Sequence, residues 1–402
     1  MQQLADKLIQ IIPHPGFIPD EYLYVGIQLA FALLVLMLFV APFAGIVSWV
    51  ERRIAARMMD RVGPNRVGPQ GFLQWLADGI KSILKEDIVP TAADPILFRL
   101  GPYLVFVGMF IAFVVVPFSS KLVIADLNVG IFYLVAVTSL VTVGILMSGW
   151  GSNNKYSLLG GMRSAAQIVA YEIPAGLAIL VIVFLSGSLS MQGIIAAQGA
   201  YPWQWFLFDN PFTLVTFFLL FIAALAEGNR APFDMPEAES ELISGYSTEY
   251  SGMRFVFFYF EEWANIYLIA AVSTTLFLGG WQIPPAVREW ATAIHALLPD
   301  LLEFVTFFLK AAVLIFVVIW VRWTLPRVRV DQLMILCWKY LVPLGFACVL
   351  GTGLWMLLFP TGLPVVRYLL VGGAAVTFGY FFYRVWYQLR AANAPIDLNP
   401  FV

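Results

Sequence analysis

The sequence contains few of the residues that bind metals and redox cofactors. Its 402 residues include two cysteines and two histidines. Cys337 and Cys348 lie 11 residues apart, and His14 and His295 are far apart in the chain. This spacing provides no CxxC pair, no ligand set for an iron–sulfur cluster and no disulfide framework. We therefore expect no metal site, haem or other redox centre on this chain.

Charged residues are also scarce. They make up 12% of the chain, whereas hydrophobic residues make up 61%. Soluble domains are usually about 45–50% apolar, so this composition predicts an integral membrane protein. The uncharged run over 22–50 is too long for the core of a signal peptide, so we expect none to be cleaved. Membrane lipids are expected partners, and nucleic acid is not.

Nine stretches are long and apolar enough to cross a bilayer, which takes about 20 helical residues. They are 22–50, 101–118, 128–149, 164–186, 211–226, 255–281, 304–322, 339–359 and 367–386. The fifth is short and the ninth is rich in glycine. No long hydrophilic domain interrupts them, so residues 1–402 are expected to form one all-α polytopic membrane domain.

Lysine and arginine are distributed unequally between alternate loops of this topology. Eighteen fall on one side, while the other side has four: Lys7, Lys121, Arg288 and Arg367. Cytoplasmic loops of membrane proteins carry an excess of basic residues. The distribution therefore predicts an N-terminus outside and a C-terminus in the cytoplasm.

Residues 71–87, GFLQWLADGIKSILKED, have the pattern of an amphipathic helix. Apolar residues recur at helical spacing from Phe72 to Ile83, and polar residues that include Lys81 take the opposite face. The pattern fits a helix lying on the inner membrane surface. It fits equally well a helix packed against the other spans by the same apolar face.

Carboxylates occur inside three successive predicted spans or at their ends. Glu172 lies in the fourth span, Glu227 follows the fifth, and Glu261 and Glu262 lie in the sixth. Charge within a membrane is costly and usually has a role. Adjacent helical residues point about 100° apart, so one of the sixth-span pair can face a shared cavity. Because a carboxyl group among apolar side chains can hold a proton near neutral pH, the set fits a proton relay.

Local neutralisation is the alternative interpretation of these charges. Arg163 or Arg254 could pair with the carboxylates, which would then only stabilise helix contacts. Lys310 is alone in the seventh span and could pair with Glu303, seven residues earlier.

The segment 226–242, AEGNRAPFDMPEAESEL, gathers negative charge between two hydrophobic spans around a single base, Arg230. Its acidic residues, with one that follows shortly after, are Glu227, Asp234, Glu237, Glu239, Glu241 and Glu249. Carboxylates bind hard cations, but this spacing matches no standard metal loop. A partner-docking surface and a solvated loop remain open. Together with the buried carboxylates, the segment fits a carboxylate-lined inlet from the cytoplasm.

Three long motifs resemble the H-subunit family of bacterial respiratory complex I, the proton-pumping NADH:quinone oxidoreductase. Its mitochondrial counterpart is NADH dehydrogenase subunit 1. The motifs are ERRIAARMMDRVGPNRVGPQGFLQWLADGIKSILKED (51–87), AEGNRAPFDMPEAESELISGYSTEYSGMRF (226–255) and RVDQLMILCWKYLVP (329–343). The resemblance covers about residues 20–360, a family core of eight spans. Residues 361–402 would add a ninth span and a cytoplasmic tail.

The resemblance implies a subunit at the junction of the electron-transfer arm and the pumping arm, in the bacterial inner membrane. Its partners would be the peripheral-arm subunits of the quinone site and small membrane subunits of the pumping arm. Ubiquinone or menaquinone would bind as substrate. NADH, FMN and the iron–sulfur clusters would belong to the partner subunits.

The motifs also assign residues to three regions. Those implied at the quinone entrance and docking face are Glu51, Arg52, Arg53 and Lys81. Those implied in the loop between the quinone chamber and the buried carboxylates are Glu227, Arg230, Asp234, Glu237, Glu239, Glu241 and Glu249. Glu172 and Glu262 would begin a hydrophilic axis towards antiporter-like subunits. Quinone reduction would then drive proton translocation through changes in charge and conformation.

Two other classes of protein stay open. A membrane-bound hydrogenase or formate-hydrogen lyase contains a related subunit that does not need the same quinone chemistry. A freestanding ion transporter would be supported by inverted repeats between the halves, and we find none.

Overall fold

The chain folds into α-helices joined by loops and short helical turns. The computed structural model describes residues 26, 30, 41–236, 239–295, 297–360 and 362–392. The described residues are 75% helical and contain no strand, so the expected all-α class is confirmed. The helices are α3 (Ala41–Met58), α4 (Gln74–Leu84), α5 (Pro95–Ala112), α6 (Gly130–Gly151), α7 (Lys155–Ser186), α8 (Met191–Ala196), α9 (Pro211–Glu227), α10 (Glu239–Leu242), α11 (Gly252–Phe277), α12 (Pro285–Ile294), α13 (Leu298–Thr324), α14 (Val330–Ile335), α15 (Val342–Leu358) and α16 (Pro364–Ala392).

Seven helices within the described residues are long and apolar enough to cross a membrane. They correspond to α5, α6, α7, α11, α13, the continuous helix made of α14 and α15, and α16. Helix α9, predicted as the fifth span, is a shorter apolar helix of 17 residues. Most of the predicted first span, 22–50, lies outside the described residues. The protein is therefore a multi-pass membrane protein, and these seven helices match seven of the nine predicted spans.

Polar caps decide where two of the long helices begin. The Asp94 carboxylate accepts a hydrogen bond from the backbone N–H of Ile96 at 2.9 Å, directly before α5. Asn154 accepts one from the backbone N–H of Tyr156 at 2.9 Å, directly before α7. Such caps satisfy N–H groups that have no partner within the helix. Both helices consequently start before the apolar stretches that predicted them.

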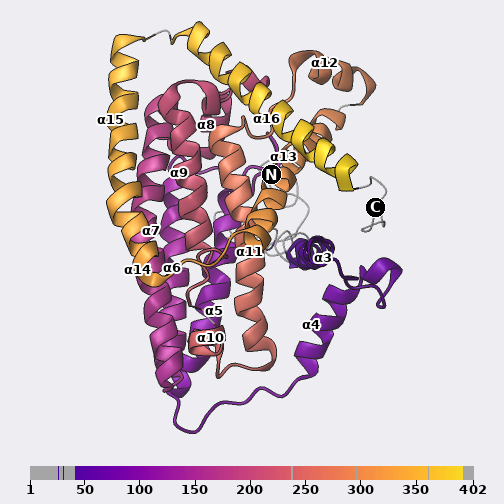
Figure 1. Cartoon of the computed structure of the whole chain (residues 1–402), viewed down its shortest axis with the longest axis vertical. Helices are drawn as coiled ribbons and strands as arrows, with labels where there is room; N and C mark the ends of the chain where they lie inside the picture. The colour runs from indigo at the N-terminus through magenta and orange to yellow at the C-terminus, as the bar shows by residue number, and fades with distance from the viewer. Residues whose placement is uncertain are drawn as a thin grey trace, which may run out of the picture.

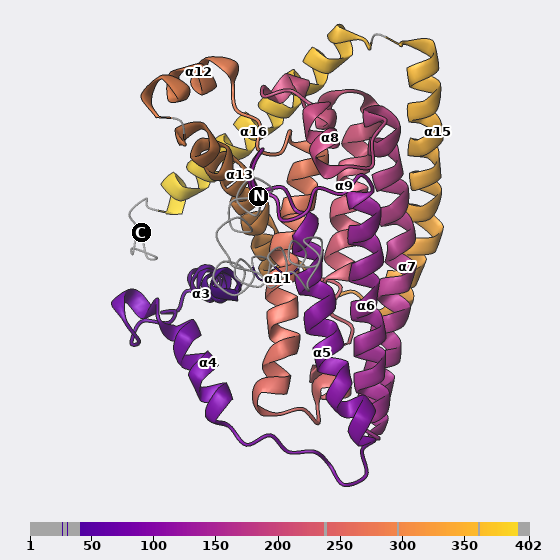
Figure 2. The same cartoon turned by 180° about the vertical axis from the view of Figure 1, so that it is seen from behind.

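Helices α5, α6, α7, α9 and α11 form a central bundle, and α3 and α13 pack on α11 (Figure 1, Figure 2). Helix α15 packs on α7 and α9. Aromatic side chains such as Phe98, Phe113, Tyr267 and Phe307 are fully buried in this core. The two ends of the bundle are named here by the short helices found there, the α10 end and the α8 end.

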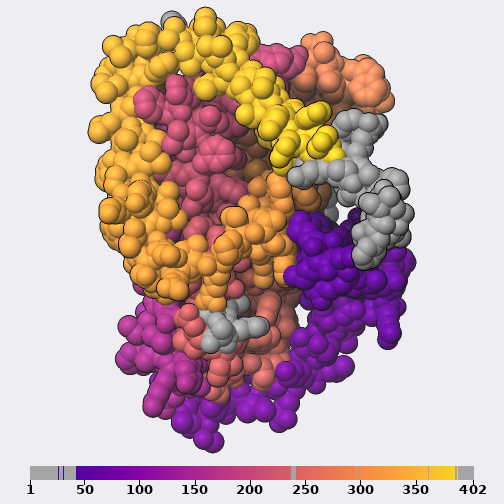
Figure 3. Space-filling model, in the orientation of Figure 1, coloured from indigo at the N-terminus to yellow at the C-terminus, as the bar shows by residue number. Residues whose placement is uncertain are grey.

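Helix α16 runs obliquely across the bundle from the end of α15 (Figure 1, Figure 3). It is attached at the α8 end, where Arg367 forms an ion pair with Asp209. Further along, the Phe381 ring lies 5.5 Å from the Trp320 ring of α13. Its most apolar stretch is 0% buried within this chain. The helix therefore adds nothing to the core.

Helix α4 is the amphipathic helix that the sequence predicts. Leu76, Ile80 and Ile83 on its apolar face are exposed. Contact with α3 is made instead through Trp75, whose ring packs so closely on Gly45 that a Cβ there would lie 2.5 Å from Trp75 Cε3. Within this chain, Phe72 at the start of the apolar face packs on Trp49 of α3, whereas the face from Leu76 to Ile83 does not pack against the other spans. That face remains available to the membrane surface.

Candidate functional site

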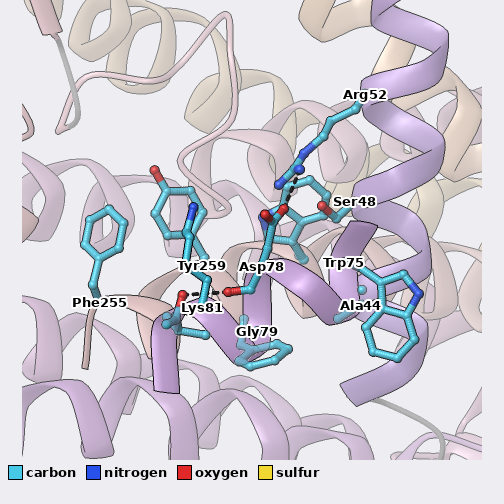
Figure 4. Close-up of a pocket in the computed structure, with 14 residues that line it drawn as sticks. Ala44, Ser48, Arg52, Trp75, Asp78, Gly79, Lys81, Phe255 and Tyr259 are labelled. Carbon is cyan, nitrogen blue, oxygen red and sulfur yellow. Dashed lines mark hydrogen bonds and ion pairs between the residues drawn. The ribbon is translucent and has the colours of Figure 1, made fainter. Parts of the chain in front are cut away.

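A cleft of about 410 Å³ opens between α3, α4 and α11 (Figure 4). Its walls are mostly apolar and include the rings of Trp75, Tyr259 and Trp263. The charged groups come from α3 and α4, where Arg52 Nη1 and Asp78 Oδ2 form an ion pair at 2.6 Å. Largely apolar walls with a few convergent polar groups are typical of small-molecule sites.

The four residues assigned to the quinone entrance lie in three places. Arg52 and Lys81 line the cleft. Arg53 Nη1 instead donates a hydrogen bond to the Gln70 carbonyl at 2.9 Å and steadies the loop before α4. Glu51 is 3% exposed and makes its ion pairs with Arg230 and Arg322, which do not line the cleft. The structure therefore brings two of the four to the cleft.

Buried ion pairs join α3, α11 and α13 beside this cleft. Arg230 Nη1 lies 3.1 Å from Glu51 Oε1, and Arg230 Nε lies 3.1 Å from Glu262 Oε1. Arg322 also pairs with Glu51. The Arg230 side chain is 1% exposed, and a charge buried that deeply is tolerated when it is paired. We call Glu51, Arg230, Glu262 and Arg322 the buried ion-pair cluster.

The loop after α9 is held in place by one glutamine of α7. Gln167 Nε2 donates hydrogen bonds to the backbone carbonyls of Ala226 and Phe233, each at 2.7 Å. Asn229, between them, adopts a left-handed conformation (φ 48°), which asparagine tolerates better than most residues. These contacts fix the short segment that carries Arg230 into the bundle.

Trp263 joins the cleft to the buried ion-pair cluster. Its ring forms part of the cleft wall and lies 5.3 Å from the Arg230 guanidinium. Trp263 follows Glu262 on α11, and Arg52 follows Glu51 on α3. On both helices one residue therefore faces the cleft while its neighbour faces the cluster.

A second cavity, of about 50 Å³, contains two of the predicted relay carboxylates. Glu172 of α7 and Glu227 of α9 both line it, together with Thr138 and Asn265. Such a volume holds a few water molecules at about 10–15 Å³ each. Glu172 Oε1 is buried and has no hydrogen-bond partner among the described residues. A polar atom so placed can accept a proton or a water molecule.

The adjacent acids of α11 face different neighbours, as their helical spacing predicts. Glu262 belongs to the buried ion-pair cluster, and the acids whose charges interact with it are Glu51 and Asp234. Glu261, which is 5% exposed, interacts with Glu262 and Arg230 on one side and with Asn265 and Glu227 of the small cavity on the other. Glu261 therefore lies between the cluster and that cavity.

Helix α7 is tied to α14 and to the turn after it beside Glu172. Pro174 lacks an N–H and leaves the carbonyl of Ala170 without its helical donor. Cys337 Sγ donates to this carbonyl at 3.1 Å. One residue on, the Tyr171 hydroxyl donates to the Leu333 carbonyl at 2.9 Å. Glu172 is consequently held on a fixed part of α7.

The remaining acids of the loop are more dispersed. Glu241 is exposed and pairs with Arg163 at 2.6 Å; this hydrogen bond holds the pKa of the Glu241 carboxyl below its usual range. Glu249 accepts a hydrogen bond from Asn154 Nδ2 at 2.6 Å. Glu237 lies outside the described residues. Glu239 begins α10, and its side chain is not described.

Two expectations about pairing are wrong. Arg163 and Arg254 do not neutralise the intramembrane carboxylates, because they pair with Glu241 and with Asp87. Lys310 does not pair with Glu303. Glu303 is completely buried, forms an ion pair with Arg288 and accepts a hydrogen bond from the Ser120 N–H. Lys310 donates instead to carbonyls at the end of α11.

Sequence reasoning missed several residues of the site. Arg322 and Asp78 were not among the predicted site residues. Thr138 and Asn265, which line the small cavity, are uncharged and gave no signal of their own. Asn265 could have been found from its position four residues after Glu261, on the same helix face.

Comparison with known proteins defines the class. Residues 30–353 match the model of a family described as NADH dehydrogenase. That match covers more than half of the chain and ends before α16. The chain therefore belongs to this family and is a membrane subunit of an enzyme complex.

The relatives indicate the particular subunit. The H subunit of the NADH-quinone oxidoreductase of Anaeromyxobacter dehalogenans is 52% identical over 371 residues, 89% of this chain and 90% of the relative. The H subunits of the same enzyme from Chlorobaculum tepidum and Chlorobium luteolum are 50% and 49% identical over 310 and 314 residues. These matches cover 76% and 77% of this chain, and 86% and 84% of the relatives. The chain is similar to the H subunit of complex I along most of its length.

Proposed function

We propose that this chain, with peripheral-arm subunits, forms the quinone-binding chamber of a proton-translocating NADH:quinone oxidoreductase in the bacterial inner membrane. We also propose that its buried carboxylates couple quinone reduction to proton translocation. The names of the relatives support the reaction, and the cleft beside a buried charged network supports the site. Small membrane subunits of the pumping arm would receive the coupling signal.

The contact of Trp263 with Arg230 is the observation that carries this proposal. One ring forms part of the cleft wall and lies against the arginine that bridges two buried carboxylates. Charge interactions are strengthened where water is excluded. A change of charge in the cleft would therefore alter the electrostatic energy of the Glu51 and Glu262 carboxylates without any large movement of the helices.

Reduction of a quinone to a quinol consumes two electrons and two protons. The electrons would come from NADH through FMN and iron–sulfur clusters on partner subunits. Arg52 and Lys81 would orient the head group, and the aromatic walls would contact its apolar part. A proton taken up at Glu262 when its pairing with Arg230 weakens would pass by way of Glu261 to Glu227 and Glu172.

The other acids would belong to the loop that joins the quinone chamber to the buried carboxylates, on the side that faces the peripheral arm. They are Asp234, Glu237, Glu239, Glu241 and Glu249. The exposed Arg163–Glu241 pair contributes little to stability, since exposed ion pairs are typically worth about 0–1 kcal/mol. The charges of this pair would contribute to the response to quinone reduction more than to the stability of the fold.

Filling the cleft tests where the quinone binds. Gly79 lines the cleft, and a Cβ added there would meet no atom within 4 Å. Gly79→Leu should therefore fold, and leucine favours a helix interior more than glycine does. We expect the KM for quinone to rise by about tenfold or more, because the substrate would be displaced from its reactive position. NADH oxidation with a soluble acceptor should not change.

Gly353→Leu is the matched control. Gly353 also has open space around a Cβ, but it lies on α15, away from the cleft. Its KM for quinone should equal that of the native complex. If Gly79→Leu and Gly353→Leu give the same KM, quinone does not bind in this cleft.

The proposed orientation places the α10 end in the cytoplasm, as the distribution of basic residues predicts. Thr91 near the α10 end and Ala197 at the α8 end are both exposed, whereas the native Cys337 and Cys348 are buried. In intact cells, an impermeant thiol reagent should label Ala197→Cys and leave Thr91→Cys unlabelled. The reverse pattern would invert the topology, and opening the cells should make Thr91→Cys reactive.

A further inference from the structure

Lys310 of α13 is a membrane-embedded cation that the proposed coupling route does not use. Its ammonium donates hydrogen bonds to the carbonyls of Leu278 at 2.7 Å and Gly280 at 2.9 Å. The same group lies 4.8 Å from the centre of the Trp205 ring. Its charge is thus fixed at the C-terminal end of α11, where helix carbonyls lack partners and the helix dipole favours a cation.

Polar groups lead along α11 from the carboxylates towards this position. Glu261 lies 17 residues before Leu278, or about 25 Å at 1.5 Å per residue. Between them, Ser273 lines the cavity of Glu172 and Glu227. The buried hydroxyls of Ser273 and Thr274 have no hydrogen-bond partner among the described residues. These groups could support water beyond the cavity, and Lys310 lies where they end.

The layer around Lys310 is otherwise neutral and closely packed. Gln198 accepts a hydrogen bond from the Gly279 N–H and donates one to the Thr275 carbonyl, both at 2.8 Å. Gln282 Nε2 donates to the carbonyl of Gln198 at 2.7 Å. A Cβ at Gly280 would lie 2.5 Å from Ile195 Cδ1. This layer closes the α8 end with amides that do not change charge.

Three acidic residues at the α8 end are already paired with other bases. Asp209 pairs with Arg367, Asp300 with Lys121, and Glu303 with Arg288. Lys310 is held by backbone carbonyls, which carry no full charge. The field of its ammonium is therefore not cancelled by these carboxylates.

We propose that Lys310 provides a fixed positive charge that prevents protons on the buried carboxylates from crossing this chain to the α8 end. A proton approaching a cation in a water-poor interior meets an electrostatic barrier, as it does at a basic residue in a selective channel. Protons of the route would then leave sideways, into neighbouring subunits. This inference rests on the proposed function only in placing protons on Glu172 and Glu227.

Passive proton flux through the reconstituted complex tests this role without NADH or quinone. The whole complex is placed in liposomes that contain a pH-sensitive dye, and a potassium diffusion potential drives protons. We expect Lys310→Gln and Lys310→Met to raise the flux by about tenfold, the factor that an electrostatic barrier of about 1.4 kcal/mol provides. Lys310→Arg should retain the native flux.

Lys121→Gln is the matched control, because Lys121 lies at the same end but is exposed and paired with Asp300. It should leave the flux unchanged. Lys310→Gln keeps an N–H donor for the α11 carbonyls and so remains informative if Lys310→Met does not assemble. A native flux in Lys310→Gln would show that Lys310 only caps α11. Equal leakage in the arginine and glutamine variants would show that packing, and not charge, forms the barrier. A failure of the quinone proposal would appear in the quinone assays and would leave this measurement readable.

Discussion

Replacing Arg230 by methionine should lower the stability of the assembled subunit by about 3–5 kcal/mol, the usual result of removing one partner from a buried ion pair. Arg230 is 1% exposed and bridges Glu51 and Glu262. Methionine would fill much of its volume but leave Glu262 without its guanidinium. Heating the purified complex and following the release of the subunit on native gels would measure the loss. Arg163→Met is the control, since Arg163 forms an exposed pair that is worth about 1 kcal/mol or less.

A second substitution separates charge from packing. The buried ion-pair cluster contains two acids and two bases, so Arg230→Met combined with Glu262→Gln restores its balance and leaves Glu51 paired with Arg322. The double variant should therefore be more stable than Arg230→Met alone, because contacting residues are not additive. Arg230→Lys should lie between, since an ammonium cannot bridge two carboxylates as a guanidinium fork does. A double variant no more stable than Arg230→Met would show that the shape of Arg230 matters and its charge does not.

The spans were predictable because the length of an apolar run is a local property. Seven predicted spans match helices of the right length, yet α7 begins nine residues before its predicted span. Counting apolar residues cannot detect this extension, because the added segment begins and ends with the charged residues Lys155 and Arg163. The cap Asn154 was visible in the sequence and could have set the boundary.

The partners of the buried charges could not be predicted in the same way. Arg230 pairs with Glu51, 179 positions away, and Arg322 pairs with Glu51 across 271 positions. Side-chain neighbours within a helix are three or four residues apart. Glu303 and Lys310 are seven residues apart, which separates them by about 10 Å along α13. Their side chains do not span this distance to form the predicted pair. Only the packing of α13 against α11 brings Lys310 to its carbonyl partners.

The orientation of Glu261 and Glu262 on α11 could be predicted only in part. The angle between adjacent helical residues predicted that the two acids have different partners, and the structure gives them Arg230 in common beside their separate neighbours. Neither acid lines the small cavity. Glu261 interacts with residues of that cavity because of how α11 is rotated against α9, and that rotation comes from tertiary packing. As a result, Glu261 joins the proposed route beside the predicted Glu262.

Glu172→Gln should abolish most coupled turnover while leaving the complex assembled. Glutamine is nearly isosteric with glutamate but cannot take up or release a proton, and loss of such a group lowers rates by about a hundredfold or more. Because Glu172 Oε1 has no hydrogen-bond partner among the described residues, the exchange breaks no bond at that atom. Quinone reductase activity and the pH gradient would be measured in inverted membrane vesicles. NADH oxidation with a soluble acceptor should remain native.

Two further variants determine whether proton exchange is responsible for the effect of Glu172→Gln. Glu172→Asp keeps a carboxyl group in the small cavity, displaced by one methylene, and should retain more coupled turnover than the glutamine variant. Glu289→Gln removes an exposed carboxylate from α12 at the α8 end and should behave as the native complex does. If Glu172→Gln sustains a native gradient, Glu172 carries no proton. The route from the buried ion-pair cluster would then leave this chain from Glu227, the other carboxylate that lines the cavity.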